Sequence, residues 1–215
     1  TTEIYTLSLH DVFAIYERSK AGGEAAVQAA YAGAVILRPS VVFGSKDQFI
    51  NKLAGMARLT PVLPIVGANT KFQPVYVKDV AEAACNAAEG RAQAGVYELG
   101  GQKTCSLKEL YSMTLAETHR RRLLVGLPFF VGGLMAFGLD MVQACTFGLA
   151  ANRILTRDQV KMLRRDNVVS DGAMGLADLG VEATSMESVL GEYLYAYRPY
   201  GQYDAITESA GNLKV

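Results

Sequence analysis

Tyr16 and Lys20 are the two residues whose types and spacing best fit acid–base chemistry. They stand four positions apart in a segment of helical composition, so both side chains project from one face of a helix. An ammonium group beside a phenol favours the phenolate and lowers the pKa of the phenol, which makes tyrosine a proton donor or acceptor near neutral pH. The same lysine can donate hydrogen bonds to ribose hydroxyls. The pair alone also fits a solvated helix surface, so both interpretations stay open at this point.

Two further motifs follow this pair in order. Arg38 to Gly44 reads RPSVVFG, and Gln73 to Ala81 reads QPVYVKDVA. In this order and spacing the sequence resembles the extended short-chain dehydrogenase/reductase superfamily, whose members carry a Tyr-x-x-x-Lys pair, a strand end of the form R-P-x-x-x-[FY]-G and a V-x-V-x-D-V-A segment. The resemblance implies a Rossmann-like fold of the extended or atypical kind.

Later segments narrow the resemblance. They read DQF at 47–49, LTRDQV at 155–160 and GLADLGVEAT at 175–184. These segments look like the dehydrogenase-like accessory subunits of respiratory complex I, the alpha-subcomplex subunit nine family, which has close relatives in α-proteobacteria. The likeness covers residues 14–200. An ordinary epimerase is not expected to share the late segments, so they are more specific than the Tyr-Lys pair.

Resemblance to this family implies a non-catalytic subunit that holds NADPH and supports the assembly and stability of the peripheral arm near the membrane and the quinone region. Tyr16 and Lys20 then correspond to positions near the nicotinamide ribose, and Pro39 and Ser40 to positions near the nicotinamide. The implied partners are other subunits of the peripheral arm and membrane junction. The implied location is the matrix side of the mitochondrial inner membrane, or the cytoplasmic face of the inner membrane in a bacterium.

The alternative is an active NAD(P)-dependent epimerase or reductase of the same superfamily, in which Tyr16 is the general acid/base and Lys20 positions the ribose. Both interpretations need a glycine-rich turn that cradles the pyrophosphate at a helix N-terminus. The sequence contains no G-x-x-G-x-x-G. NADPH is therefore expected of the complete family fold rather than of these residues alone, and a separate N-terminal half is a candidate partner.

The elements that must position these motifs alternate in type. Segments of helical composition lie at 11–31, where Gly22 and Gly23 weaken the pattern, and at 47–59 and 78–89. Apolar β-branched runs that predict strands lie at 34–42, 72–77 and 96–99. The alternation predicts an α/β fold with a Rossmann-like parallel sheet that is incomplete at its N-terminal side.

Three domain-scale regions are expected. Residues 1–103 read as the C-terminal portion of an NAD(P)-binding domain, 104–200 as a mostly helical subdomain and 201–215 as a polar tail. Helix starts are predicted from three Ser/Thr-x-x-Glu/Gln patterns, at Ser106 with Glu109, Thr156 with Gln159 and Thr184 with Glu187. Asp79 is expected to cap the helix that follows it.

The segment Phe129 to Ala150 has 15 apolar residues and 4 glycines among 22, with no basic residue. It is long enough to cross a bilayer, which takes roughly 20 residues. Asp140 opposes a span, since an aspartate at mid-bilayer costs about 3 kcal/mol. A helix that is buried or contacts another subunit, a helix in the membrane interface and a true span all remain open.

Arg120, Arg121 and Arg122 form the one positive cluster, directly upstream of that segment. Such a run often ends a solvated helix, where arginine complements the helix dipole. Beside an exposed apolar helix it also fits anionic lipid headgroups. These three arginines and Phe130 are therefore the candidate lipid contacts.

Composition excludes several classes of function. The 215 residues carry 21 basic and 21 acidic side chains, which removes the basic footprint of most nucleic-acid-binding proteins. Cys85, Cys105 and Cys145 fit no zinc pattern, and His10 and His119 lie too far apart to suggest metal ligation. No metal site and no nucleic-acid partner are predicted.

Overall fold

The computed structural model describes residues 11–145, 157–199 and 201–203. The α-helices are α1 (Asp11–Ala30), α2 (Ile50–Leu59), α3 (Val77–Ala88), α4 (Leu107–Glu117), α5 (Phe129–Cys145), α6 (Arg157–Met162) and α7 (Met186–Leu194). The strands are β1 (Val35–Pro39), β2 (Val42–Phe43), β3 (Val62–Val66), β4 (Lys71–Phe72), β5 (Val75–Tyr76), β6 (Gly95–Leu99), β7 (Cys105–Ser106) and β8 (Leu123–Leu127). Short 3-10 helices are η1 (Ala177–Leu179), η2 (Tyr195–Tyr197) and η3 (Gly201–Tyr203).

Parallel pairing dominates the described strands. β1 pairs with β6, β2 with β5 and β3 with β8, all parallel, whereas β4 and β7 are antiparallel. Parallel partners require long crossovers, and helices such as α2 and α3 lie between the paired strands in sequence. The predicted α/β fold with parallel strands is therefore confirmed.

Strand boundaries differ from the sequence predictions. The run 34–42 is divided into β1 and β2, and the run 72–77 into β4 and β5. β3, β7 and β8 are not among the strands predicted from the sequence. Pro64 lies within β3, opposite Val125 of β8. In the described part of the chain β3 pairs with β8 alone, and a proline is tolerated in such an edge strand because it needs no ladder hydrogen bond on its open side.

Helix starts agree with the patterns in one case and differ in two. Ser106 and Glu109 form the predicted reciprocal capping box on α4. The prediction that Thr184 caps α7 is wrong by one residue, since Ser185 accepts the hydrogen bond from the Ser188 amide. The prediction that Asp79 caps α3 is also wrong, because no side chain caps that helix at Tyr76.

Both wrong predictions have the same cause. The buried carboxylate of Asp79 accepts hydrogen bonds from the amide and the hydroxyl of Thr184, each at 2.7 Å. Asp79 and Thr184 are therefore hydrogen-bond partners of each other, 105 positions apart in sequence, and neither residue caps α3 or α7. The contact ties the C-terminal segment to the first turn of α3. Thr156, the remaining predicted start, lies outside the described residues, and α6 begins at the next position.

Three clusters of buried side chains form the core. The largest lies among α2, α4 and α7, where Ile50, Leu110 and Leu190 are fully buried. A second lies between the β1–β6 pair, α3 and η1 and includes Tyr97 and Leu179. A small third cluster joins the end of β3 to α5 and α6. The predicted domain boundary after Lys103 stays a prediction.

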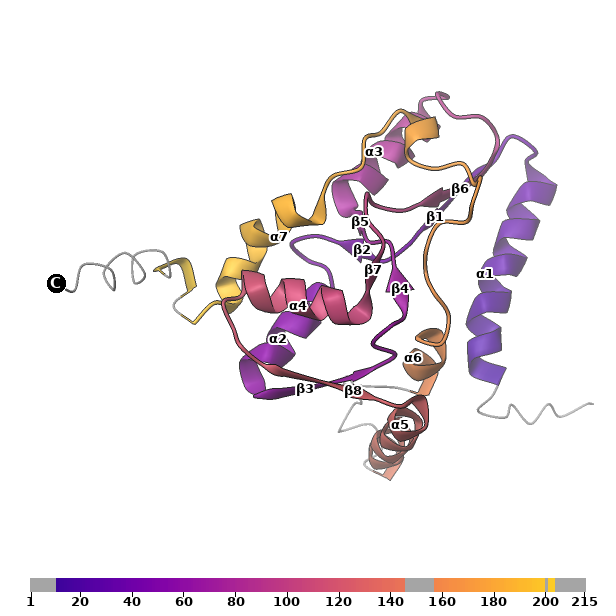
Figure 1. Ribbon diagram of the computed structural model, residues 1–215. Helices are drawn as coiled ribbons and strands as arrows, with labels where there is room; N and C mark the ends of the chain where they lie inside the picture. The colour runs from indigo at the N-terminus through magenta and orange to yellow at the C-terminus, as the bar shows by residue number, and fades with distance from the viewer. Residues whose placement is uncertain (1–10, 146–156, 200, 204–215) are drawn as a thin grey trace, which may run out of the picture.

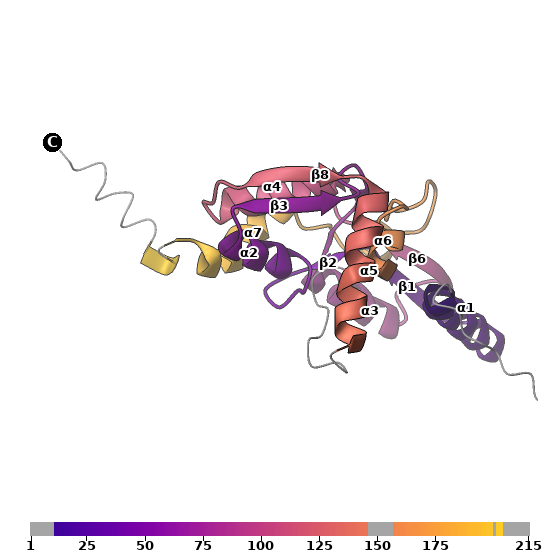
Figure 2. The same cartoon turned by 90° about the horizontal axis from the view of Figure 1, so that it is seen from below.

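Helix α1 is set apart from these clusters. It stands to one side of the molecule in Figure 1, and the view from below in Figure 2 again places it at the far end. It runs unbroken through Gly22 and Gly23. From Ser19 to Ala30 every side chain is exposed except that of Glu24, which is half-buried. The helix therefore lacks the cover that flanking helices of a parallel sheet usually have.

Candidate functional site

The carboxyl ends of β1 and β6 are the place where a Rossmann-like sheet binds its ligands. Pro39 is the last residue of β1 and is exposed, and Ser40 follows it and is half-buried. The Ser40 amide donates to the carbonyl of Leu99, the last residue of β6, at 2.9 Å. The structure therefore places both predicted nicotinamide-side residues at this edge.

Tyr16 and Lys20 lie one turn apart on α1, as predicted. The Tyr16 side chain is outside the described residues, whereas that of Lys20 is exposed. Glu24 continues the same stripe one turn later. Its carboxylate is ion-paired with Arg38 of β1, whose Nε lies 3.1 Å from both carboxylate oxygens. Because Arg38 precedes Pro39, this ion pair places Glu24 beside the carboxyl end of β1.

This ion pair changes the acidity of both partners. The hydrogen bond from Arg38 lowers the pKa of Glu24, and the same bond raises the pKa of Arg38. Arg38 also lies 3.9 Å from Glu98 of β6. Neither Glu24 nor Arg38 was a predicted site residue. Arg38 belongs to the RPSVVFG motif, and Glu24 follows Lys20 by one helical turn. Both residues could therefore have been predicted from the sequence as part of this site.

An extended segment, residues 166–170, crosses the same edge, and we call it the crossing segment. Its Asn167 carbonyl accepts hydrogen bonds from the Ser40 hydroxyl at 2.8 Å and from the Gln73 amide at 3.1 Å. The Val169 amide donates to the Gln73 side chain at 3.0 Å, and the Ser170 amide donates to the Glu98 carboxylate at 2.8 Å. The chain's own backbone thus lies against the ends of β1, β4 and β6.

The polar groups at this edge act as structural partners. The Ser170 hydrogen bonds lower the pKa of Glu98, which keeps it ionised as an acceptor. The Ser40 hydroxyl already donates to a backbone carbonyl. Gly100 lies so close to Gln73 and Val169 that an added Cβ would come within 2.6 Å of both side chains. Among the described side chains here, Ser40, Gln73 and Glu98 are therefore held by the fold rather than poised toward a substrate.

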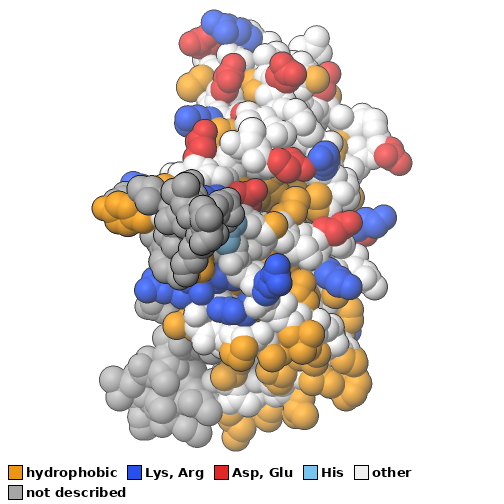
Figure 3. Space-filling model, turned by 60° about the vertical axis from the view of Figure 1, so that its left-hand side comes forward, with side chains coloured by type: hydrophobic (Ala, Val, Ile, Leu, Met, Phe, Trp, Pro, Cys, Tyr) orange, Lys and Arg blue, Asp and Glu red, His pale blue; other side chains and the backbone are white. Residues whose placement is uncertain are grey.

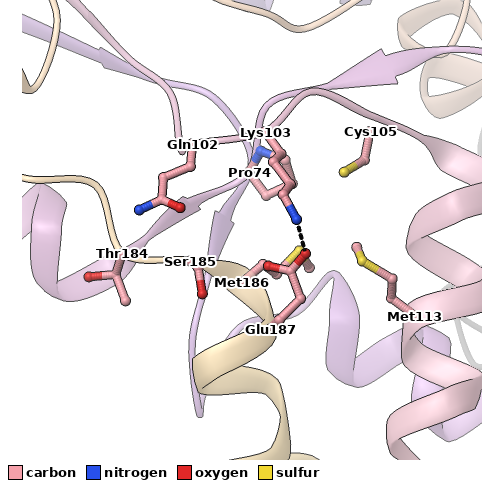
Figure 4. A pocket seen from close by; sticks show the side chains of 9 residues that line it. All are labelled: Pro74, Gln102, Lys103, Cys105, Met113, Thr184, Ser185, Met186 and Glu187. Carbon is pink, nitrogen blue, oxygen red and sulfur yellow. Dashed lines mark hydrogen bonds and ion pairs between the residues drawn. The ribbon is translucent and has the colours of Figure 1, made fainter.

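A small pocket lies nearby, beyond β6, between the start of α4 and the start of α7 (Figure 4). It holds about 290 Å³ of empty space, including its open mouth. The Lys103 ammonium and the Glu187 carboxylate form an ion pair of 2.6 Å beside it. Burial raises the pKa of the Cys105 thiol in its wall. A protonated thiol is a poor nucleophile, so the pocket offers no evident catalytic group.

The basic segment lies on another side of the molecule. His119 has a positive φ of 51° just after α4, and the Arg120 amide donates back to the Leu115 carbonyl, which turns the chain sharply. The Arg120 side chain donates to the Tyr197 carbonyl at 2.8 Å, and the Arg122 side chain donates to the Ala57 carbonyl at 2.7 Å. Arg121 is exposed.

Phe130 lies in the first turn of α5 and is exposed. The described helices include none that is both long and apolar enough to cross a membrane. Asp140 has no described side chain, and residues 146–150 of the predicted apolar segment lie outside the described part. The structure thus separates the predicted site residues: Pro39 and Ser40 lie at the sheet edge, Lys20 lies on α1, the three arginines lie between α4 and β8, and Phe130 lies in α5.

Comparisons with known proteins agree with the fold and the motifs. Residues 11–127 match the family model of the RmlD substrate binding domain. Over 188 residues the chain is 35% identical to the NADH dehydrogenase [ubiquinone] 1 alpha subcomplex subunit 9 of Arabidopsis thaliana mitochondria, covering 86% of this chain and 47% of that protein. The mouse protein of the same name is 34% identical, with 85% and 47% covered.

A solved structure supports the Rossmann-like architecture. The dTDP-glucose 4,6-dehydratase of Bacillus anthracis, solved with NAD, superposes with a TM-score of 0.58 at 15% identity and covers 85% of this chain and 51% of that chain. At this identity the likeness concerns the fold alone. The chain spans about half the length of the curated relatives it matches.

Proposed function

Since the chain belongs to the RmlD substrate binding domain family, we propose that it serves as a non-catalytic accessory subunit of respiratory complex I. The observation that carries this proposal is the 34–35% identity to two alpha subcomplex subunits 9 over 188 residues. In this role the chain supports the assembly and stability of the peripheral arm near the membrane. Its partners are other complex I subunits.

The geometry of the sheet edge supports a role without turnover. A catalytic serine or carboxylate must present its reactive atom to a substrate. Here the Ser40 hydroxyl donates to Asn167 and the Glu98 carboxylate accepts from Ser170. Both partners belong to the crossing segment, which lies across the edge where the fold family binds ligands. Turnover would require this segment to release both groups.

NADPH fits one side of the proposed site. Lys20 is exposed on α1, one turn before the Glu24 that is ion-paired with Arg38, and Pro39 is exposed at the carboxyl end of β1. We infer that Tyr16 and Lys20 hold the nicotinamide ribose, while Pro39 and Ser40 lie beside the nicotinamide. The cofactor supplies a hydride donor when bound. The glycine-rich cradle for its pyrophosphate is not in this sequence, so another part of the fold must provide it.

The open edge of β1 gives that other part a place to dock. In the described part of the chain β1 pairs with β6 on one side, and its second edge carries no strand. The exposed α1 flanks the same strand through the Glu24–Arg38 ion pair. We infer that an N-terminal nucleotide-binding half, in the same polypeptide or a separate one, adds its sheet to this edge. The proposed location is the matrix side of the mitochondrial inner membrane, or the cytoplasmic face of a bacterial one.

The substitution Tyr16→Phe separates this role from that of an active epimerase or reductase. In the accessory role no proton moves at Tyr16, so quinone-linked NADH oxidation by the assembled complex stays unchanged. In an active enzyme the loss of the acid/base hydroxyl would lower turnover by about 10²–10⁴-fold. Tyr31→Phe, at another exposed tyrosine, is the matched control. Turnover of a nucleotide sugar that falls in Tyr16→Phe but not in Tyr31→Phe would refute the proposal.

A further inference from the structure

The outer side of α5 is an exposed apolar surface. Phe130 is 75% exposed and Leu134 71%, and Phe137 and Met141 continue the exposed side at helical spacing. The opposite side is packed, since Ala136 is fully buried and Gly132 is so close to Val66 that an added Cβ would come within 2.6 Å of its side chain. The helix is therefore fixed on the end of β3 and displays its large apolar side chains outward.

The β3–β8 pair extends this surface. Side chains alternate between the faces of a strand, so Val62 and Pro64 share a face with Val66, on which α5 lies. The register pairs Val62 with Leu123. Leu123 is 64% exposed, and Leu59, just before β3, is 82% exposed. The half of this face that α5 leaves open is therefore apolar and uncovered. Figure 2 shows β3, β8 and α5 along this side of the molecule.

Arginines border the open half. Arg58, which directly precedes Leu59, and Arg121, which lies two positions before Leu123, are both exposed. Burial and the positive charges of Arg122 and Arg58 lower the pKa of Arg120, as expected where like charges gather. Figure 3 shows basic side chains beside a broad group of hydrophobic ones at the lower right. In the described part of the chain no ion pair joins these arginines to a carboxylate.

Part of this cluster has a structural role. The Arg122 Nε caps the C-terminal end of α2 at the Ala57 carbonyl, and Nη1 donates to the Arg121 carbonyl. Arg120 is held at the Tyr197 carbonyl. These contacts fix the guanidinium groups in place but do not neutralise them. The chain as a whole carries equal numbers of acidic and basic residues, so the concentration of positive charge here is local.

We propose that this surface, formed by α5, the outer face of β3–β8 and the arginines Arg58, Arg120, Arg121 and Arg122, docks onto an anionic lipid leaflet. Large apolar side chains enter the boundary between headgroups and acyl chains, while the arginines meet lipid phosphates. A second copy of the chain would bring the same basic cluster to the interface, where like charges repel. The proposal does not depend on the accessory role, since it concerns a separate surface.

Vesicle co-sedimentation of the full-length protein tests this surface. We expect binding to vesicles of phosphatidylcholine mixed with phosphatidylglycerol, and much weaker binding to phosphatidylcholine alone. The double variant Arg58→Gln/Arg121→Gln should lower the affinity about tenfold or more, because each charge near the surface contributes on the order of 1 kcal/mol. Phe130→Asp/Leu134→Asp should abolish binding, and circular dichroism should show an unchanged fold, since both side chains are exposed.

The matched control is Lys46→Gln/Lys108→Gln, which removes the same charge at exposed positions elsewhere and should bind like the unmodified protein. Equal binding to both kinds of vesicle, or equal losses in the arginine and lysine variants, would overturn the proposal. Failure to bind any vesicle, together with loss of a co-purifying acidic protein in the arginine variant, would also overturn it and assign the surface to a protein partner.

Discussion

Two uncovered regions of this molecule differ in almost every physical respect. The exposed side of α1 between Ser19 and Ala30 is rich in alanine and glycine, and α1 is attached to β1 by the Glu24–Arg38 ion pair. The surface of α5 and β3–β8 carries phenylalanine, leucine and methionine with arginines at its border. Small side chains allow another protein layer to approach closely, whereas large apolar side chains beside positive charge fit a lipid interface. Exposure alone therefore does not identify a partner.

The largest expected effect tests whether the α5 surface is truly outside the core. Leu110→Ala should lower the free energy of unfolding by about 2–5 kcal/mol, because this fully buried side chain leaves a cavity. Leu134→Ala, the same change on the exposed side of α5, should alter it by no more than about 0.5 kcal/mol. Urea unfolding of the two variants measures the difference. A large loss in Leu134→Ala would mean that this surface is part of the core.

An intermediate effect is expected where the C-terminal segment joins the sheet region. Asp79→Ala removes the buried carboxylate that accepts both hydrogen bonds from Thr184 and leaves the half-buried Thr184 amide and hydroxyl without their acceptor. The expected loss is about 1–3 kcal/mol in the free energy of unfolding. Asp178→Ala, which removes an exposed carboxylate bonded to the Gly175 amide, is the control and should cost less. Similar losses in both variants would contradict the role given to the buried contact.

The smallest effect concerns the attachment of α1. The pKa of Glu24 is lowered in the folded protein, so its ion pair contributes fully above the usual value of 4.5 and the contribution is lost as pH falls through the lower folded value. Because Arg38 is exposed and Glu24 only half-buried, solvent screens the pair and we expect it to contribute less than about 1 kcal/mol. The protection factors of the α1 amides, which are exchange rates corrected for intrinsic exchange at each pH, should fall at acidic pH, and Glu24→Gln should remove that dependence. Protection factors that do not change with pH in the unmodified protein would exclude this attachment.

Much of the fold could be predicted because its signals are local. The Ser106–Glu109 capping box and the helical segments depend on residues within one or two turns, and they are found as predicted. β3 was missed because Pro64 argues against a paired strand locally, while its partner β8 lies about 60 positions away. Asp79 and Thr184 were wrongly predicted as helix caps for a similar reason, because each forms its hydrogen bonds with the other, far away in the sequence.

The candidate site also has a part that could be predicted from local sequence patterns and a part that could not. The position of Lys20 on a helix and of Pro39 at a strand end follows from local pattern. The crossing segment was not foreseen, because its bonds to Ser40, Gln73 and Glu98 join residues 72–127 positions apart. The sequence also gave no means of telling which apolar side chains of the segment from Phe129 would face outward, since that depends on the contact of Gly132 with Val66.

The most direct test of the accessory role is purification of the full-length protein from its native membranes, followed by identification of the co-purifying subunits and assay of NADH:quinone oxidation. We predict a large assembly that contains complex I subunits, oxidises NADH with quinone and carries this chain in stoichiometric amount. A small homo-oligomer that turns over a nucleotide sugar with NAD(P), without complex I subunits, would contradict the account.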